Sequence, residues 1–482
     1  MVAVTQPSLA KILYICLAGF LSLAGLLGQD ASTRVFAALF IFRYYRLLVG
    51  ITAYFFHRAV PVSAVPVLGP CNVTAILPTV DPQSPESLRT FRSVLGSGVA
   101  RLLVVIPLDR LWGVNYLEHE DLASAYLDGR LRIQCCFEEV DGRQVSIANK
   151  RQQVAKGLEV VEALRDTPIV VLVDDHVEWP TNFLVNILAP FANSRVGGVA
   201  TWKRVKRRGC LQSLFGAFVY RLWHKMCLLV SGNNVNFPVQ LWPFLCCVWF
   251  DFWNFIGCLY LERHNFDITA SHYIDKSIFV VSGRTAAYRS EIICTSEFRK
   301  AFCNESWFGV GPLNADDDNF ITRWLIKHNW QIGWQHGAEA TILTTVGDSG
   351  FLKFNAQCLR WARTAWRSNW TSLWADHRAV LASYPWSIYA IYLTSFVNFA
   401  LLTDSVLLGL CWKGSNLLSV FYILLWIVCS KLVKPMPHFL RHPRDLVYFP
   451  GYVLFGYYHS LLKLYALFTL RNIAWGSRPG VG

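Results

Sequence analysis

The stretch "IVVLVDDHVEWP", Ile169 to Pro180, runs five apolar residues directly into two adjacent carboxylates, Asp174 and Asp175, which His176 follows. A short, continuous apolar run of this kind is typical of a strand that is buried on both faces of a parallel sheet. We therefore predict that the paired carboxylates stand at the carboxyl end of a buried strand.

Helical stretches separate this run from others like it. The segments 72–79 ("NVTAILPT"), 101–107 ("RLLVVIP") and 196–205 ("VGGVATWKRV") read as further strands, and 145–164 carries apolar residues at helical spacing. Apolar strands that alternate with helices predict an α/β domain with a mostly parallel sheet. Ligands of such sheets bind at the carboxyl ends of the strands.

Two roles are open for Asp174 and Asp175. Aspartate is common at the first turn of a helix, where its side chain caps the backbone. Adjacent carboxylates at a strand end also suit Mg²⁺ or Mn²⁺, with a nucleotide diphosphate supplying the remaining oxygen ligands.

A second acidic cluster, Asp316, Asp317 and Asp318, precedes a helix-compatible run in "FGVGPLNADDDNFITRWLIKHNW". Acids at a helix N-terminus are favoured by the helix dipole. Three consecutive carboxylates also repel one another, which raises the pKa of one of them and suits it to act as a general base.

The segment "NAQCLRWARTAWRSNW" is the most specific. In a helix over about 352–371, Gln357, Arg360 and Trp361 share one face. One interpretation is an amphipathic helix on a membrane surface. The other is a binding site, in which an arginine fork holds a diphosphate and an indole holds a sugar ring. The two interpretations are compatible, because one helix can lie on the membrane surface and also line a binding site.

The composition indicates a membrane protein with a soluble portion. The 482 residues are 54% hydrophobic and 16% charged, against about 25% charged in ordinary soluble domains. The net charge of +13 fits an anionic membrane face or a phosphorylated substrate. Nucleic acid is not expected as a partner, because no Lys/Arg-rich tail or zinc finger is present. The 14 cysteines include no C-x-x-C pair and read as reduced thiols.

Long apolar runs lie at both ends of the chain. We expect a membrane region at 1–60, a cytosolic domain at 61–376 and a second membrane region of about three helices at 377–482. Leu9–Gly28 is the length of one span, whereas Arg43 and Arg46 interrupt 35–56, which either spans or lies in the interface. The C-terminal candidates are Tyr384–Cys411, Leu417–Val433 and Leu446–Leu470.

The charged turn "KLVKPMPHFLRHPRD", 431–445, favours a cytosolic position for that turn. Basic residues at both ends of the central domain place it in the cytosol too. The sequons at Asn72, Asn304 and Asn369 would then stay unglycosylated.

Together these motifs resemble those of the membrane-embedded family-2 glycosyltransferases, among them the fungal type 2 glycosyltransferases and the hyaluronan, chitin and cellulose synthases. The resemblance spans about 72–370 and rests on "ILPTVDP", "NKRQQ", "VLVDDHVEWP", "VVSGRTAAYRSEI", "DDDNFITRW" and "QCLRW". It implies a GT-A-type, Rossmann-like domain, a UDP-sugar donor, and transfer with inversion to a growing polysaccharide or other glycan acceptor.

The resemblance also implies roles for individual residues. Asp318 would be the catalytic base with Asp317 beside it, and Asp174, Asp175 and His176 would hold Mn²⁺ or Mg²⁺. The donor nucleotide and diphosphate would contact Thr79, Asp81, Lys150, Arg151, Gln357 and Arg360, and the acceptor would contact Ser282, Gly283, Arg284 and Trp361.

The chain departs from the family pattern in two places. Related synthases carry D-x-D where this chain reads Val173-Asp174-Asp175-His176, and histidine suits Mn²⁺ better than Mg²⁺. The apolar segment at about 209–250 is an insertion, read either as an interfacial helix pair or as translated intron.

We expect a processive synthase that exports a cell-wall-type polysaccharide through its own helices, as a multi-pass protein of the plasma membrane. The alternatives are a single-addition transferase acting on a lipid or glycan, and a silent membrane scaffold with the same fold. The identity of the sugar stays open.

Overall fold

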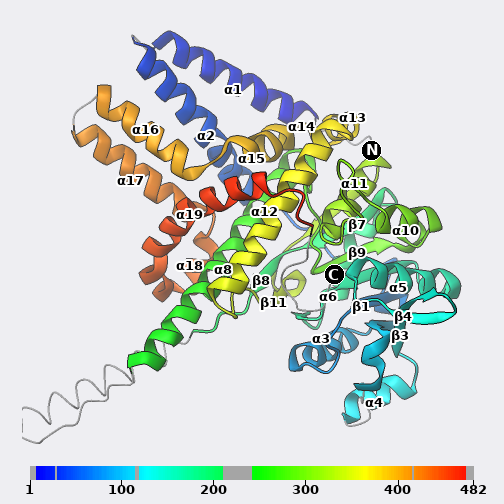
Figure 1. Cartoon of the computed structure of the whole chain (residues 1–482). Coiled ribbons are helices and arrows are strands. Elements are labelled where there is room, and N and C mark those ends of the chain that lie inside the picture. Colours follow the sequence, from blue (N-terminus) through cyan, green and yellow to red (C-terminus); the bar gives the residue numbers. More distant parts are fainter. Residues whose placement is uncertain (1–6, 28–29, 114–118, 210–240, 415–416, 474–482) are drawn as a thin grey trace, which may run out of the picture.

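The computed structural model describes residues 7–27, 30–113, 119–209, 241–414 and 417–473 (Figure 1). Of the predicted insertion at 209–250, residues 210–240 lie outside the described residues. Residues 241–250 form the start of a long helix, α8 (Leu241–Asp275).

The largest sheet among the described residues has eight strands in the order β10-β7-β9-β5-β1-β2-β3-β4. Their bounds are β1 (Val73–Pro78), β2 (Arg101–Pro107), β3 (Leu131–Val140), β4 (Arg143–Ser146), β5 (Ile169–Val173), β7 (Val196–Thr201), β9 (Thr285–Arg289) and β10 (Gln331–Gln335). β5, β1, β2 and β3 run parallel, as do β7 and β10. β9 is antiparallel to both β5 and β7. The predicted α/β domain with a mostly parallel sheet is confirmed.

One predicted strand divides between two sheets. Residues 196–205 form β7 in the large sheet and β8 (Lys203–Val205) in a small sheet of order β6-β11-β8, with β6 (Val177–Glu178) and β11 (Ile342–Thr344). The division falls at Trp202, whose backbone N–H still bonds the carbonyl of Gln335 at 3.1 Å.

Helices cover both faces of the large sheet, so the domain has three layers (Figure 1). α3 (Pro85–Gly96), α4 (Glu120–Leu127) and α6 (Phe183–Leu188) bury one face. α5 (Lys150–Leu164), α9 (Ser290–Ile293), α10 (Ser296–Cys303) and α11 (Asp317–Lys327) bury the other. Along β5, Val171 and Val173 belong to the first layer and Val170 and Leu172 to the second, so the run is apolar throughout because both faces are covered.

The start of α5 determines where its first side chains lie. The predicted helix at 145–164 is shorter than expected, since its first residues complete β4. Asn149 caps the helix, and its side chain accepts the backbone N–H of Arg151 at 2.9 Å. Lys150 is therefore the first helical residue, next to the carboxyl end of the sheet.

Two N-terminal helices, α1 (Pro7–Leu27) and α2 (Ala31–Phe56), are long and apolar enough to cross a membrane. In Figure 1 they lie beside α16 (Ala400–Gly414) and α17 (Leu417–Val433), away from the sheet. Arg43 of α2 pairs with Asp404 at 2.6 Å, and Arg46 donates to the carbonyl of Ala390 at 2.8 Å. Both arginines are thus satisfied by neighbouring helices, as charges within apolar segments require.

The predicted span Tyr384–Cys411 is not a single helix. It consists of α14 (Pro385–Ser387), a π-helical turn η6 (Ile388–Leu393) and α15 (Thr394–Val397), and it breaks before α16. α13 (His377–Ser383) meets the segment Pro385–Val397 at 116°. Pro385 explains the bend, because a proline disfavours helical backbone in the residue before it.

The long helices α8 and α12 (Phe351–Trp374) connect the sheet domain to the apolar helices and pack against α19 (Phe449–Phe468) and α18 (Met436–Arg441). The remaining short helices are η1 (Pro70–Asn72), η2 (Leu108–Gly113), η4 (Ala189–Ala192), η5 (Ala338–Ala340) and η7 (Pro443–Tyr448).

The charged turn at 431–445 docks on α8. Lys434 donates to Asp267 at 2.6 Å, and Arg441 pairs with the buried Glu262. Asp445 binds Arg207, at the end of the small sheet, at 2.8 Å. Ion pairs thus join this turn to the sheet domain.

Candidate active site

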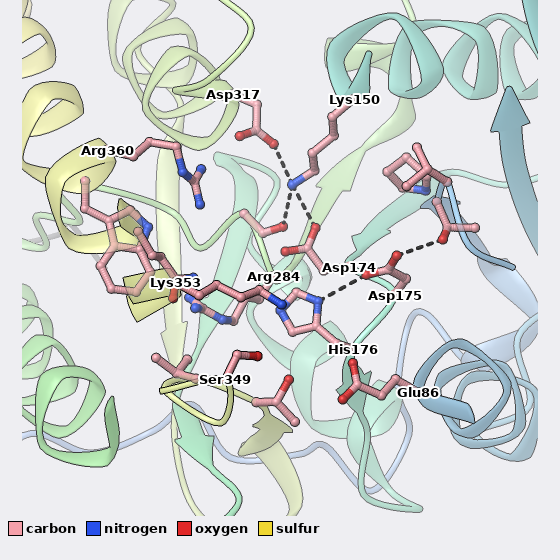
Figure 2. A pocket seen from close by; sticks show the side chains of 18 of the residues that line it. Glu86, Lys150, Asp174, Asp175, His176, Arg284, Asp317, Ser349, Lys353 and Arg360 are labelled. Atoms are coloured by element: carbon pink, nitrogen blue, oxygen red, sulfur yellow. Dashed lines mark hydrogen bonds and ion pairs between the residues drawn. The ribbon is translucent and has the colours of Figure 1, made fainter. Parts of the chain in front are cut away.

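A cavity of about 240 Å³ opens at the carboxyl ends of β1 and β5 (Figure 2). β1 and β5 contribute the residues that directly follow them, α5 and α11 contribute their first turns, and α12 closes one side. The predicted site residues that line it are Thr79, Lys150, Asp174, Asp175, His176, Gly283, Arg284, Asp317, Asp318, Gln357, Arg360 and Trp361.

Lys150 is the central cation of this cavity. Its Nζ lies 2.7 Å from Oδ1 of Asp174 and 2.9 Å from Oδ2 of Asp317, and it donates to the carbonyl of Gly283 at 3.3 Å (Figure 2). The two carboxylates outweigh the effect of burial and raise the pKa of Lys150, so the side chain stays charged. The lysine brings together the two acidic clusters, which are more than 140 residues apart in the sequence.

Asp175 is held differently from its neighbour. The hydroxyl of Thr79 donates to its Oδ2 at 2.7 Å, and Nδ1 of His176 lies 3.1 Å from its Oδ1. The imidazole therefore contacts the neighbouring carboxylate through Nδ1, and its role as a metal ligand stays a prediction. Among the described residues, no three His, Cys, Asp or Glu side chains converge as a metal site. The carboxylates of Asp174 and Asp175 still reach the cavity wall, and such oxygens bind Mg²⁺ or Mn²⁺ together with phosphate.

Asp318 stands at the start of α11, opposite Gly283. A Cβ atom on residue 283 would make an ordinary van der Waals contact with Oδ2 of Asp318, at 3.4 Å, so this carboxylate lies directly beside Gly283. Burial raises the pKa of Asp318 to about 6, and the charges of Asp317 and Asp316 add to the increase. The pKa of Asp317 is lowered instead, because Lys150 outweighs its burial. Of these two neighbours, Asp318 is the one suited to accept a proton near neutral pH.

α12 presents Gln357, Arg360 and Trp361 to the cavity, as the helical spacing predicts. The guanidinium of Arg284 lies 5.6 Å from the centroid of the Trp361 ring, and the ring of Tyr260 packs on the same tryptophan at 4.9 Å. The cavity therefore offers cations for an anionic group and a flat aromatic surface beside the raised-pKa carboxylate.

Three predicted contacts lie elsewhere. Arg151 is buried behind the cavity, where it pairs with Glu305 at 2.7 Å, and this position does not fit its predicted contact with the donor. Asp81 is exposed and does not line the cavity. Ser282 is buried below the cavity floor, where its hydroxyl accepts the backbone N–H of Arg284 at 3.2 Å.

Several functional candidates had no clear sequence signal. Glu86, Asp348, Ser349 and Lys353 line the cavity from loops and helix starts that carry no recognisable motif. Lys203 is buried next to the cavity, and its Nζ lies 3.0 Å from Nδ1 of His264. Burial and the nearby charge of Arg284 lower the pKa of Lys203 to about 7. Its place in an apolar strand was the one available signal.

Comparisons with known proteins find similarity to glycosyltransferases. The family described as "Glycosyltransferase like family 2" matches residues 129–364. A "Type 2 glycosyltransferase" of Gibberella zeae is 35% identical over 452 residues, which are 92% of this chain and 75% of that protein. A "Hyaluronan synthase" of Streptococcus pyogenes is 24% identical over 214 residues, which are 44% of this chain and 48% of that protein.

Among solved structures, the mannosyltransferase PcManGT of Pyrobaculum calidifontis, in complex with GDP-Man and Mn²⁺, has a TM-score of 0.50 at 15% identity. The match covers 90% of this chain and 98% of that one. At this identity the likeness supports the fold alone.

Proposed function

The chain belongs to glycosyltransferase family 2, and from this premise we propose that it transfers sugar from a UDP-sugar to extend a β-linked polysaccharide, with inversion at the anomeric carbon. One observation carries the proposal. The raised-pKa carboxylate of Asp318 shares a cavity with the cations Lys150 and Arg360 and with the indole of Trp361.

The mechanism follows from these positions. The indole of Trp361 would support the acceptor sugar, whose hydroxyl attacks the anomeric carbon. Asp318 takes the hydroxyl proton while the new C–O bond forms and the bond to the diphosphate oxygen breaks. Lys150 and Arg360 stabilise the charge that develops on the diphosphate.

A divalent cation is part of the proposal. Asp174 and Asp175 would hold Mn²⁺ or Mg²⁺ together with the donor diphosphate, and the ion would offset the negative charge of the leaving group. His176 would keep Asp175 oriented, as its contact at 3.1 Å indicates. Partners outside the ligand shell often tune a metal site in this way.

We also propose multi-pass insertion with the catalytic domain in the cytosol and export of the polymer through the helices. Two candidate spans near the N-terminus support membrane association. The contacts between the turn at 431–445 and α8 support placing that turn on the catalytic side. The plasma membrane is the proposed location, because the polymer would be exported.

The direct test is UDP release from membranes that contain the protein, with each UDP-sugar supplied in turn. Release with one sugar would establish the donor, and sizing the product would separate processive extension from a single addition to a lipid or glycan. Failure of every donor and metal to give release, with protein shown to be folded, would contradict the proposal.

The rate should depend on pH through Asp318. Because the ionised form is the base, kcat/KM should fall as the pH drops through about 6, the pKa of Asp318, and decrease about tenfold for each further unit. Initial rates of UDP release between pH 5 and pH 8 would measure this. A flat profile across pH 6 would exclude Asp318 as the titrating base.

Metal removal should stop transfer. Since a bound cation contributes several kcal/mol to charge stabilisation, chelation with EDTA should lower UDP release at least about 100-fold, and added Mn²⁺ should restore it. Asp175→Asn should need more Mn²⁺ for half-maximal rate, whereas His176→Ala should have a smaller effect. Full activity after chelation and dialysis would contradict the metal assignment.

A further inference from the structure

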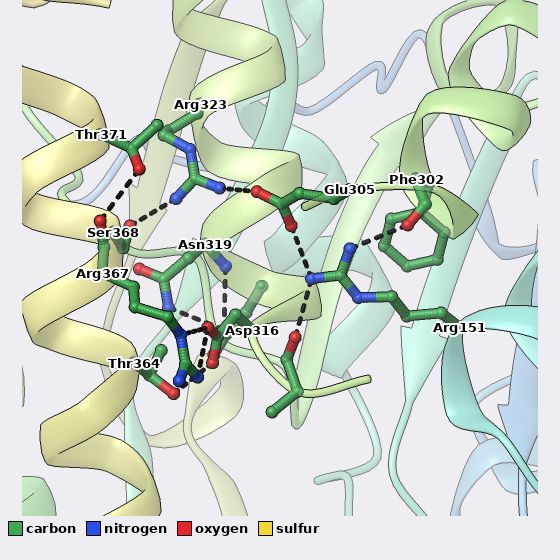
Figure 3. A network of polar contacts seen from close by, with 12 residues as sticks. Arg151, Phe302, Glu305, Asp316, Asn319, Arg323, Thr364, Arg367, Ser368 and Thr371 are labelled. Atoms are coloured by element: carbon green, nitrogen blue, oxygen red, sulfur yellow. Dashed lines mark hydrogen bonds and ion pairs between the residues drawn. The ribbon is translucent and has the colours of Figure 1, made fainter. Parts of the chain in front are cut away.

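Asp316 is the first residue of the second acidic cluster and, unlike Asp317 and Asp318, does not line the cavity. Its side chain is 3% exposed and accepts from Nη2 and Nε of Arg367 on α12, at 2.9 and 3.1 Å (Figure 3). The hydroxyl of Thr364, one turn earlier on α12, bonds its other oxygen. The Arg367 side chain is equally buried, and it also donates to the carbonyl of Leu470 at 3.0 Å.

The backbone at Asp316 explains why the ion pair with Arg367 affects the start of α11. Its φ of 75° is left-handed, a conformation that aspartate tolerates better than most residues. The helix begins at the next residue, and Asp318 is its second position. A residue that anchors Asp316 therefore also fixes the direction in which Asp318 leaves the turn.

A second buried network supports the same joint. Arg323 of α11 bonds Ser368 of α12 and pairs with Glu305. The other oxygen of Glu305 pairs with Arg151, whose Nη2 also donates to the carbonyl of Ala315 at 2.7 Å (Figure 3). The first turn of α5, the segment before α11, α11 itself and the C-terminal half of α12 are thus held together.

We propose that Asp316 and Arg367 are positioning residues for the transfer step, whose buried ion pair fixes Asp318 on α11 against Arg360 and Trp361 on α12. The pair touches neither donor nor acceptor. The inference rests on the proposed role of Asp318 as the base.

The pair also sets part of the charge that Asp318 experiences. Asp316 and Asp317 raise the pKa of Asp318, and Lys150 lowers it. Within the described part of the chain, Asp318 also interacts with Lys203 on β8, Arg284 and Tyr288 at β9, and Arg360 on α12. Arg367 compensates Asp316 directly. Removing one member of the pair should therefore move the acidic limb of the pH–rate profile in one direction, and removing the other should move it in the opposite direction.

The test compares pH profiles of kcat/KM for UDP release from membranes with the full-length protein. Asp316→Asn keeps the shape and tolerates the left-handed backbone, so its acidic limb should move to lower pH by roughly half a unit to one unit. Arg367→Gln should move the limb to higher pH by a similar amount. The double variant should return close to the parent profile, with kcat lower and KM for the donor little changed.

Arg363→Gln is the matched control, because Arg363 lies one turn earlier on α12 and bonds Thr469 at 3.0 Å instead of an acid of the site. Its limb should not move. Shifts in the same direction for both single variants, or an unmoved limb in Asp316→Asn, would overturn the inference.

An unmoved acidic limb in Asp316→Asn would overturn the inference even if Arg367→Gln fails to fold. The base assignment is tested separately by Asp318→Asn: if that variant stays active, the proposed function is at fault. If it is inactive while the limbs stay fixed, only the positioning role fails.

Discussion

Asp318→Asn should lower kcat for UDP release about 1,000-fold and leave KM for the donor nearly unchanged. General-base catalysis contributes about 100- to 10,000-fold, and asparagine keeps the size of the side chain while it loses the ability to take a proton. The donor contacts assigned to Lys150 and Arg360 remain in place. Steady-state kinetics in membranes, with the correct sugar donor, would give both constants.

A surface aspartate provides the control for this variant. Asp121 is exposed, pairs with Arg92 at 2.7 Å and does not line the cavity. Asp121→Asn should keep the parent kcat, because exposed ion pairs contribute at most about 1 kcal/mol. A loss of less than about tenfold in Asp318→Asn would move the base to another residue.

Lys150→Met should be at least as damaging. The substitution removes a cation from the diphosphate site and leaves the carboxylates of Asp174 and Asp317 facing each other without the charge that now separates them. Leaving a buried ion-pair partner uncompensated costs about 3–5 kcal/mol. We expect kcat/KM to fall about 1,000-fold or more and the thermal midpoint to drop. Lys150→Arg keeps the charge and should recover part of the activity.

Lys156 lies on the same helix and is the matched control. It pairs with Glu159 at 3.0 Å on the solvent side of α5. Lys156→Met should change stability by less than about 1 kcal/mol and leave kcat/KM unchanged. Equal effects at the two positions would show that Lys150 matters only for the helix, and donor titrations with thermal melts would separate the cases.

The sequence correctly predicted the residues whose position depends on a single strand or helix. The apolar run of β5 ends in Asp174 and Asp175, and the acids at 317–318 begin a helix. Both follow from period and capping rules that act within a few residues. The family resemblance implied that the two clusters serve one site, but it did not predict that Lys150 contacts both of them, since nothing local brings them together.

Neighbouring residues of one motif were harder to separate. Lys150 and Arg151 are adjacent cations, and both were expected at the donor. In the first turn of α5 the helix turns about 100° between them, so Lys150 faces the cavity and Arg151 faces Glu305. Which of the two faces the cavity depends on the rotation of α5 on the sheet, and packing determines that rotation.

Long-range packing also decided the other differences. The strand predicted at 196–205 changes sheets at Trp202 because β10 and β11 pair with its two halves. Lys203 is buried beside His264 although lysine is a surface residue in most proteins. The strands β10 and β11 and the residue His264 are all far in the sequence from the segments they contact.

The ion pairs between the turn at 431–445 and α8 bear on how modular this enzyme is. Sequence boundaries suggest a catalytic unit that ends near residue 376, yet Glu262 and Asp267 of that unit are matched by Arg441 and Lys434 from beyond it. A fragment cut at the sequence boundary would lose both counter-charges together with the apolar cover of α8. A chimaera that exchanges catalytic halves between relatives therefore has to carry this turn along with them.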